Sequence, residues 1–295
     1  PVMTQMNPLR DDQLQASHQV GNSFGVNGFA DITPSFVKGL KLTLNGTINN
    51  YEYRYNSTVQ PFYGTNGTTY PNGYVQVGHY RTYTVNFQQL INYARSFGKH
   101  NVTLMAGHEN FKNTYEYVTG SRSNMFSFET NHELSGAITN QSTNSTQTNY
   151  NTEGFFFRGM YDYDNKYFGQ VSFRRDGSSN FDPDHCWGNF YSFGGAWILS
   201  KEDWMESTQS WLDMLKLKFS FGQQGNDAIG SSRYFDLYSI SSMAGELALN
   251  FSFKGNRNIT WETNTNINAG VEFELFKGRL QGEVEYFYRK TTDML

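Results

Sequence analysis

The sequence predicts an all-β fold: an antiparallel meander of about ten strands that forms part of the wall of a transmembrane β-barrel. Two observations lead to this prediction. Apolar and polar residues alternate along short segments, and the connections between these segments are alternately short and long. Residues 215–221 alternate most clearly, with leucine or phenylalanine at odd positions and lysine or serine at even positions. Because successive side chains of a strand point to opposite faces, one face would meet lipid and the other a hydrated lumen.

Ten segments carry this alternation, and we expect each to be one strand. The predicted strands are 21–31, 40–53, 80–96, 102–117, 154–163, 167–175, 189–199, 214–223, 267–275 and 280–290. The apolar sets expected to face lipid include Leu40/Leu42/Leu44/Ile48, Tyr83/Val85/Phe87/Ile91/Tyr93, Phe155/Phe157/Tyr161 and Val271/Phe273/Leu275. The polar sets expected to face the lumen include Lys41/Thr43/Asn45, Thr84/Asn86/Gln88/Asn92, Arg158/Asp162 and Glu272/Glu274.

The connections separate into two kinds. Four are tight and rich in turn-forming residues, at 34–39, 97–100, 164–166 and 276–279. The connection 200–213 is longer and starts like a helix at Ser200, so we expect one helical turn there. The other four are long and polar, at 54–79, 118–153, 176–188 and 224–266. Short periplasmic turns opposite long extracellular loops are typical of bacterial outer-membrane barrels, whereas a soluble sandwich gives no reason for this sorting.

One stretch inside the second long connection is of low complexity. Residues 140–149 read NQSTNSTQTN, and we expect a mobile, solvated loop there.

Composition agrees with a barrel wall and excludes several other classes. Charged residues make up 17% of the chain, below the roughly 25% of soluble domains. No apolar run approaches the ~18 residues of a transmembrane helix, while alternating strands give a polar average hydropathy. The net charge of -4 and the lack of a basic cluster argue against a nucleic-acid partner. The single cysteine, Cys186, excludes an intrachain disulfide.

Motifs for catalysis, metals or cofactors are weak or missing. Gly225 and Gly230 have the spacing of a phosphate-binding loop, but Ser231 stands where that loop needs lysine. The six histidines are scattered without the spacing of metal ligands. Charged residues on the polar face could pair for acid–base work, but a hydrated lumen wall explains them better. We therefore expect no enzymatic activity, no metal and no cofactor.

Aromatic residues in or near the long loops are the better candidates for ligand contact. We favour Trp187 and Trp261, with Tyr234 and Phe235 behind them. Flat aromatic faces suit the apolar faces of sugar rings, and neighbouring Asn, Gln and Asp residues can bond hydroxyl groups. The alternative is that these side chains pack the loops or anchor the barrel at the membrane interface.

Several ordered motifs carry a resemblance to a family. Residues 157–167 and 174–181 resemble the R-x-x-Y-x-Y-x-x-K-Y … R-x-D-G-S-S-x-F run of SusC/RagA-type TonB-dependent transporters from Bacteroidota. Residues 187–192 and 196–202 resemble W-G-x-F-P-S … G-W-x-x-x-x-E, with Tyr191 in place of the proline. Further matches are 215–226 to L-K-L-R-x-S-x-G-x-x-G-N, and 260–263 with 276–292 to W-E … F-x-x-R-L … Y-x-x-x-T-x-x-L.

The resemblance implies a much longer protein with a barrel of about 22 strands and a plug. Residues 1–295 would then be an internal part of the barrel domain, and the plug, the TonB box and the closing C-terminal strands would lie outside them. The implied function is import of a large nutrient, above all an oligosaccharide, across the outer membrane. The implied partners are a SusD-like surface lipoprotein, the TonB complex through the N-terminal region, and outer-membrane lipid.

Alternatives remain open at this point. The ligand of a barrel of this kind could be a peptide, or the protein could import a siderophore or cobalamin with the same fold. A secreted carbohydrate-binding or hydrolytic β-protein is an alternative from another class. It would require a soluble core and, for hydrolysis, two facing carboxylates.

Overall fold

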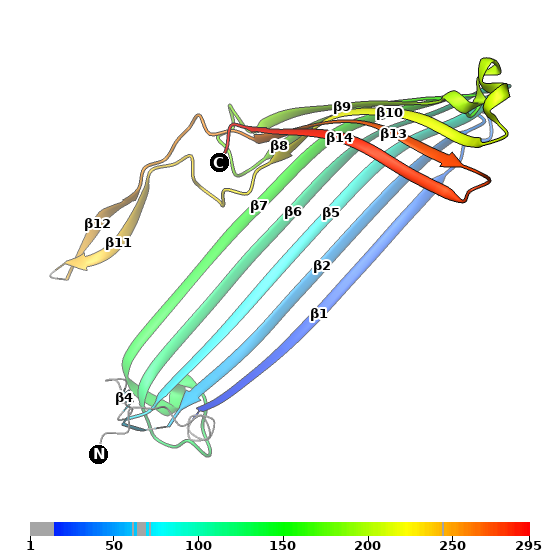
Figure 1. The fold of residues 1–295 in the computed structure, drawn as a ribbon. Helices are drawn as coiled ribbons and strands as arrows, with labels where there is room; N and C mark the ends of the chain where they lie inside the picture. The colour runs from blue at the N-terminus through cyan, green and yellow to red at the C-terminus, as the bar shows by residue number, and fades with distance from the viewer. Residues whose placement is uncertain (1–14, 61, 64–68, 71, 244) are drawn as a thin grey trace, which may run out of the picture. The chain divides into compact units, whose positions relative to one another are not determined.

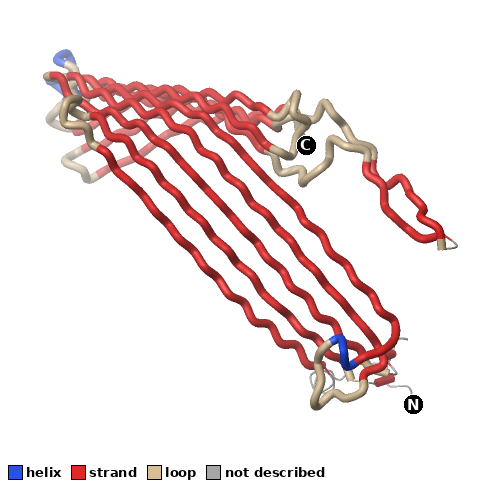
Figure 2. Tube along the Cα trace, turned by 180° about the vertical axis from the view of Figure 1, so that it is seen from behind, coloured by secondary structure: helices blue, strands red, loops and turns tan. Residues whose placement is uncertain are grey.

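A computed structural model of the chain describes residues 15–60, 62–63, 69–70, 72–243 and 245–295. Ten strands form one sheet in which each strand hydrogen-bonds to the next in sequence (Figures 1 and 2). They are β1 (Gln15–Ile32), β2 (Leu40–Val59), β5 (Tyr74–Phe97), β6 (His100–Met125), β7 (Ala137–Tyr163), β8 (Tyr167–Ser178), β9 (Trp187–Ile198), β10 (Leu212–Asn226), β13 (Glu262–Leu275) and β14 (Leu280–Thr292). The predicted ten-strand meander is therefore confirmed.

The chain forms two compact units, each described by itself below. The first unit contains residues 1–27, 47–85 and 112–149, and the second contains 28–46, 86–111 and 150–295.

The strands are longer than the sequence predicted, at the ends that border the long loops. β7 begins at Ala137, so the tract 140–149 is strand, and the prediction of a mobile loop there was wrong. The polar side chains of this tract can be solvated on both faces of a strand. The strand itself is stable because its backbone groups are hydrogen-bonded in the sheet. β5 likewise begins at Tyr74 and β6 continues to Met125, inside the segments predicted as loops.

Four further strands were not predicted. Strands β11 (Leu237–Met243) and β12 (Glu246–Phe253) pair as a separate antiparallel hairpin within the connection between β10 and β13, visible in Figure 1. The two-residue strands β3 (Phe62–Tyr63) and β4 (Thr69–Tyr70) pair in the connection between β2 and β5.

The predicted helical turn lies between β9 and β10, as the 3-10 helices η2 (Leu199–Lys201) and η3 (Asp203–Thr208). A third such turn, η1 (Leu134–Gly136), precedes β7. Ser200 does not cap a helix; its hydroxyl accepts a hydrogen bond from the Leu215 backbone N–H at 3.2 Å. None of the helical segments in the described ranges has the length and apolar character needed to cross a membrane.

The tight turns depend on backbone conformations that few residues adopt. Asp164 and Asn165 both have positive φ, 55° and 50°, between β7 and β8. Two successive positive φ values match the twist of a two-residue hairpin turn, for which Asp and Asn are well suited. Gly39 has φ of 88°, and a Cβ there would lie 2.2 Å from the Ala94 carbonyl oxygen. Glycine is therefore required at position 39.

The apolar face of the second unit remains open instead of enclosing a core. Val171, Phe219 and Val284 expose 53%, 44% and 69% of their surface. Such a face is expected for a sheet that meets lipid and not for a soluble sandwich. Among the described residues, buried apolar side chains form two small clusters, Val75, Met125 and Ala137 in the first unit and Phe181, Phe190 and Trp261 in the second.

Candidate ligand-facing surfaces

The polar face of the second unit is crosslinked by charged and amide side chains from neighbouring strands. Lys216 on β10 lies 3.2 Å from a Glu272 carboxylate oxygen on β13. Lys218 on β10 pairs with Glu283 on β14, and Ser220 accepts a hydrogen bond of 3.2 Å from the Asn268 amide. These contacts pair charged and polar side chains of this face with one another, as expected for a hydrated wall.

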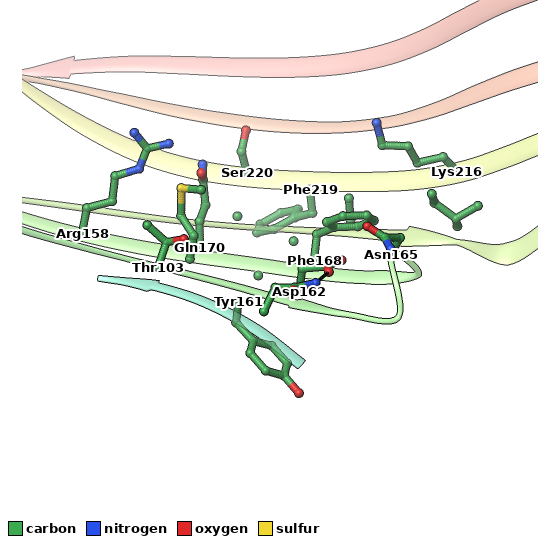
Figure 3. Close-up of a pocket in the computed structure, with 17 residues that line it drawn as sticks. Thr103, Arg158, Tyr161, Asp162, Asn165, Phe168, Gln170, Lys216, Phe219 and Ser220 are labelled. Atoms are coloured by element: carbon green, nitrogen blue, oxygen red, sulfur yellow. Dashed lines mark hydrogen bonds between the residues drawn. The ribbon is translucent and has the colours of Figure 1, made fainter. Parts of the chain in front are cut away.

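A hollow of about 670 Å³ lies on this sheet beside the 164–166 turn. Figure 3 shows Arg158, Gln170 and Lys216 around it, with the Tyr161 phenol pointing away. The Asn101 amide donates to Asp162 Oδ1 at 2.5 Å, while Asp162 Oδ2 is buried without a hydrogen-bond partner among the described residues. Because it adjoins a tight turn, the hollow lies at the end of the strands that the sequence pattern assigns to the periplasmic side, away from the long loops.

One carboxylate joins two motifs that are far apart in sequence. Glu202, after η2, accepts hydrogen bonds from the Trp197 indole N–H at 2.8 Å and the Tyr167 hydroxyl at 2.6 Å. Its second oxygen lies 2.7 Å from Lys166 Nζ, in the turn before β8. The hydrogen bond from Lys166, and then that from Tyr167, holds the pKa of Glu202 below its ordinary value. This turn clamp, formed by Lys166, Tyr167, Trp197 and Glu202, joins the K-Y positions of the first matched motif to the W and E positions of the second.

Trp261, one of the four predicted ligand contacts, is almost fully buried. It exposes 8% of its surface and packs on Phe181 and Phe190, with ring centroids 5.4 and 5.5 Å away. Its indole N–H donates to the Cys186 carbonyl at 2.8 Å. The indole is therefore packed between Phe181, in the loop before β9, and Phe190 of β9, and little of its surface is open to a ligand.

Trp187, the second predicted contact, is the first residue of β9 and is partly exposed. The Arg175 guanidinium lies 5.1 Å from its ring centroid, and the Phe155 ring lies 6.2 Å away. Phe155 belongs to the set predicted to face lipid, so Trp187 lies on that face and matches an interfacial aromatic residue.

Tyr234 and Phe235, the third and fourth predicted contacts, form a pair in the connection between β10 and β11. Their ring centroids are 4.1 Å apart, and Phe235 exposes 45% of its surface. Lys254 and Asp236 form an ion pair of 2.9 Å beside them, and the Asp236 carboxylate also accepts the Gly255 backbone N–H. The structure does not bring this pair into contact with the Trp261 cluster among the described contacts.

Sequence reasoning missed two further surfaces. One is the hairpin face, formed by Tyr238, Ile240, Leu247, Leu249 and Phe251 of β11 and β12, which are 56–73% exposed. The period-two alternation within 237–253 could have revealed it. The other is a group of tyrosines on β2, β5 and β6, namely Tyr51, Tyr53, Tyr55, Tyr80, Tyr115 and Tyr117, all of which except Tyr55 lie within the strands predicted from the sequence.

Among the described residues, no group of three or more His, Cys, Asp or Glu side chains could hold a metal ion.

Comparison with known proteins gives concordant results. Residues 5–295 match the family described as TonB dependent receptor-like, beta-barrel. TonB-dependent receptor P39 of Formosa agariphila is 29% identical over 98% of this chain, and SusC of Bacteroides thetaiotaomicron is 27% identical over 98%. The solved structure of the RagAB peptide transporter superposes with a TM-score of 0.86 and 29% identity, over 96% of this chain.

The chain therefore belongs to the TonB-dependent receptor β-barrel family, which is a family of receptors and transporters and not of enzymes. Within that family, the relatives confirm the SusC/RagA type suggested by the motifs. The chain spans 28% of the P39 sequence, 29% of SusC and 31% of the RagAB chain that it matches.

Proposed function

We propose that the protein containing this chain imports a large nutrient across the outer membrane, with energy relayed by TonB. The family match over residues 5–295 is the observation that carries the proposal. In this function the present strands contribute lumen wall and loops, and they carry the paired polar face and the lipid-compatible apolar face that such a wall needs.

The cargo we propose is an oligosaccharide, and the second candidate is a peptide. The peptide candidate rests on the likeness to RagAB, which is a peptide transporter. The oligosaccharide candidate rests on uncharged, aromatic-rich surfaces in this chain. We retain Trp187, Trp261, Tyr234 and Phe235 as proposed cargo contacts. Tyr234 and Phe235 are the favoured pair, because Trp261 is 8% exposed and Trp187 lies on the same face as Phe155, which is predicted to meet lipid.

Growth tests the proposed function. Deleting the complete gene from its host should abolish growth on one glycan or peptide source, and the complete gene should restore it. Dissipating the proton gradient should stop uptake of the same compound in intact cells. Unchanged growth on every glycan and peptide source would refute import of either cargo.

A SusD-like lipoprotein that covers the extracellular loops is the proposed partner. The hairpin face supports it, since Ile240 and Leu249 lie opposite each other across the two strands and are 73% and 61% exposed. An isolated two-stranded hairpin with an open apolar face is marginally stable and gains most from a covering surface.

The partner proposal has a matched control on the same hairpin. Replacing Ile240 and Leu249 together by Ser should release the lipoprotein from the purified transporter. Replacing Ser239 and Asn250 by Ala alters the opposite face of the hairpin, and copurification should be retained. If the Ser variant assembles and still copurifies with the lipoprotein, the hairpin face does not hold it.

A further inference from the structure

Six tyrosines of the first unit form a continuous aromatic surface across three neighbouring strands. Tyr80 on β5 is at its centre: its ring is stacked on Tyr53 of β2 at 4.7 Å with planes 7° apart. On the other side it stacks on Tyr117 of β6 at 5.3 Å and 27°. Tyr55 and Tyr115 lie 5.8 and 6.3 Å from Tyr80. We call this surface the tyrosine platform; its members are Tyr51, Tyr53, Tyr55, Tyr80, Tyr115 and Tyr117.

Hydrogen bonds establish which face of the sheet carries the platform. Thr84, four residues after Tyr80 on β5, donates to Asn113 of β6 at 3.0 Å. The Asn144 amide of β7 donates to the Tyr117 hydroxyl at 3.1 Å. Residues an even number apart on a strand share a face, and Thr84 is one of the residues predicted to face the lumen. We therefore place the platform on the lumen side.

The opposite face of the same strands has a different chemistry. Arg81, next to Tyr80, donates to Asn50 at 2.7 Å and to Glu116 at 3.3 Å. The Arg81 guanidinium also lies 5.5 Å from the ring centroid of Tyr83, which belongs to this opposite face.

Charge is divided sharply between the two faces. The platform face takes the odd residues of 47–57, the even residues of 74–84 and the odd residues of 113–123, and none of these is Asp, Glu, Lys, Arg or His. They are Tyr, Thr, Asn, Ser, Gln and one Gly. The alternate positions carry every Asp, Glu, Lys, Arg or His of these segments: Glu52, Arg54, His79, Arg81, Glu116 and Arg122.

Space for the rings is provided by the single glycine of the platform face. A Cβ on Gly78 would lie 2.3 Å from the Tyr55 ring, so the ring rests directly on the strand backbone. Tyr51 exposes 46% of its surface and the other five tyrosines are partly exposed. The platform is thus neither a packed core nor a set of freely mobile side chains.

We propose that the tyrosine platform is a binding site for an uncharged oligosaccharide on its way through the barrel. The inference rests on the proposed import function, and it adds where the cargo binds and that the cargo is uncharged. Stacked, pre-positioned rings offer flat apolar faces to the C–H faces of sugar rings, and Tyr, Thr, Asn and Gln groups bond hydroxyls in both directions.

The absence of charge on these positions decides between cargo classes. A peptide has charged termini and side chains, and an anionic siderophore or acidic glycan has carboxylates. Each would lose water on this face without gaining a counter-charge, which is unfavourable. An uncharged glycan has no such requirement.

The test uses the complete transporter, purified in detergent and applied to an array of neutral glycans, acidic glycans and peptides. The neutral glycan that binds best is then titrated calorimetrically against three variants. Tyr80→Ala removes the centre of the platform, and Tyr117→Ala removes one flank. Tyr83→Ala is the matched control, because it deletes the same kind of side chain from the opposite face of the same strand.

We expect neutral glycans to bind, Tyr80→Ala and Tyr117→Ala each to weaken binding about 10- to 30-fold, and Tyr83→Ala to leave it unchanged. Heat-modifiable migration in gels reports barrel assembly, and Tyr117→Ala provides the result if Tyr80→Ala does not assemble. Neutral binding that both platform variants retain would overturn the inference and leave the import function intact. Binding of acidic glycans or peptides in place of neutral glycans would overturn it as well. If the unaltered transporter bound no compound of the array, the proposal of an oligosaccharide cargo would fail as well.

Discussion

Replacing Trp261 by Ala should loosen the loop that precedes β9. The indole is 8% exposed, and the substitution removes its contacts with Phe181 and Phe190 together with its hydrogen bond to the Cys186 carbonyl. Deleting a buried aromatic side chain costs about 3–5 kcal/mol, part of it from the cavity left behind. Since each 1.4 kcal/mol is a factor of about ten, local opening should become a hundredfold or more frequent.

Hydrogen exchange followed by mass spectrometry measures that opening. The backbone amides of Ser178 and His185 are bonded within this loop, to the carbonyls of Cys186 and Asp182 at 3.1 and 2.8 Å. Their peptides should exchange much faster in Trp261→Ala, while those of the central strands should not change. Trp261→Phe keeps one aromatic ring but loses the indole donor, worth about 1 kcal/mol, and part of the ring volume, so its effect should be smaller than that of Trp261→Ala.

Trp204→Ala is the control for the same substitution at an exposed site, since Trp204 on η3 is 62% exposed. Exchange in the 178–187 loop should match wild type in this variant. If Trp261→Ala also exchanged like wild type, the cluster would not be holding the loop, and our reading of its burial would be wrong.

Two further predictions concern the turns. Because the pKa of Glu202 is lowered below 4.5 by Lys166 and Tyr167, its ionised form stabilises the turn clamp above that pH, and the stabilisation is lost as the pH falls through the lowered pKa. Glu202→Gln should therefore reduce the melting temperature of the protein at pH 7, and the melting temperature should fall less between pH 5 and pH 3 than in wild type. If it fell as steeply as in wild type, this prediction would be wrong. Gly39→Ala should cost about 1–3 kcal/mol through its positive φ and the clash with Ala94, seen as poorer assembly, whereas Gly169→Ala, with open space at its Cβ, should assemble normally.

Sequence patterns predicted the number, order and faces of the ten strands, because period-two alternation is strong wherever one face meets lipid. They failed where both faces are solvated. In 140–149 every residue is polar, so no alternation distinguishes strand from loop, and tertiary pairing decides. The hairpin at 237–253 alternates, but it lies within a long connection that was taken as a loop in its entirety.

The candidate sites were only partly accessible from sequence. Trp261 and Trp187 were selected for their ring size, and sequence could not reveal that Phe181 and Phe190 cover the first or that Arg175 lies over the second. The tyrosine platform needs three strands in correct register, which requires pairings between residues more than 25 positions apart. The sorting of charges between alternate positions begins within the predicted strands, at Glu52, Arg81 and Glu116, so the sequence pattern does contain that part of the signal.

The turn clamp also bears on how adjacent hairpins find their alignment. A strand that slips by one residue turns its apolar side chains to the wrong face, but a slip of two residues restores the alternation and goes undetected by it. Such a slip displaces a strand by about 7 Å, enough to separate Lys166 and Tyr167 from Glu202. One carboxylate shared by the turn before β8 and the chain after β9 therefore disfavours misalignments that the hydrophobic pattern accepts.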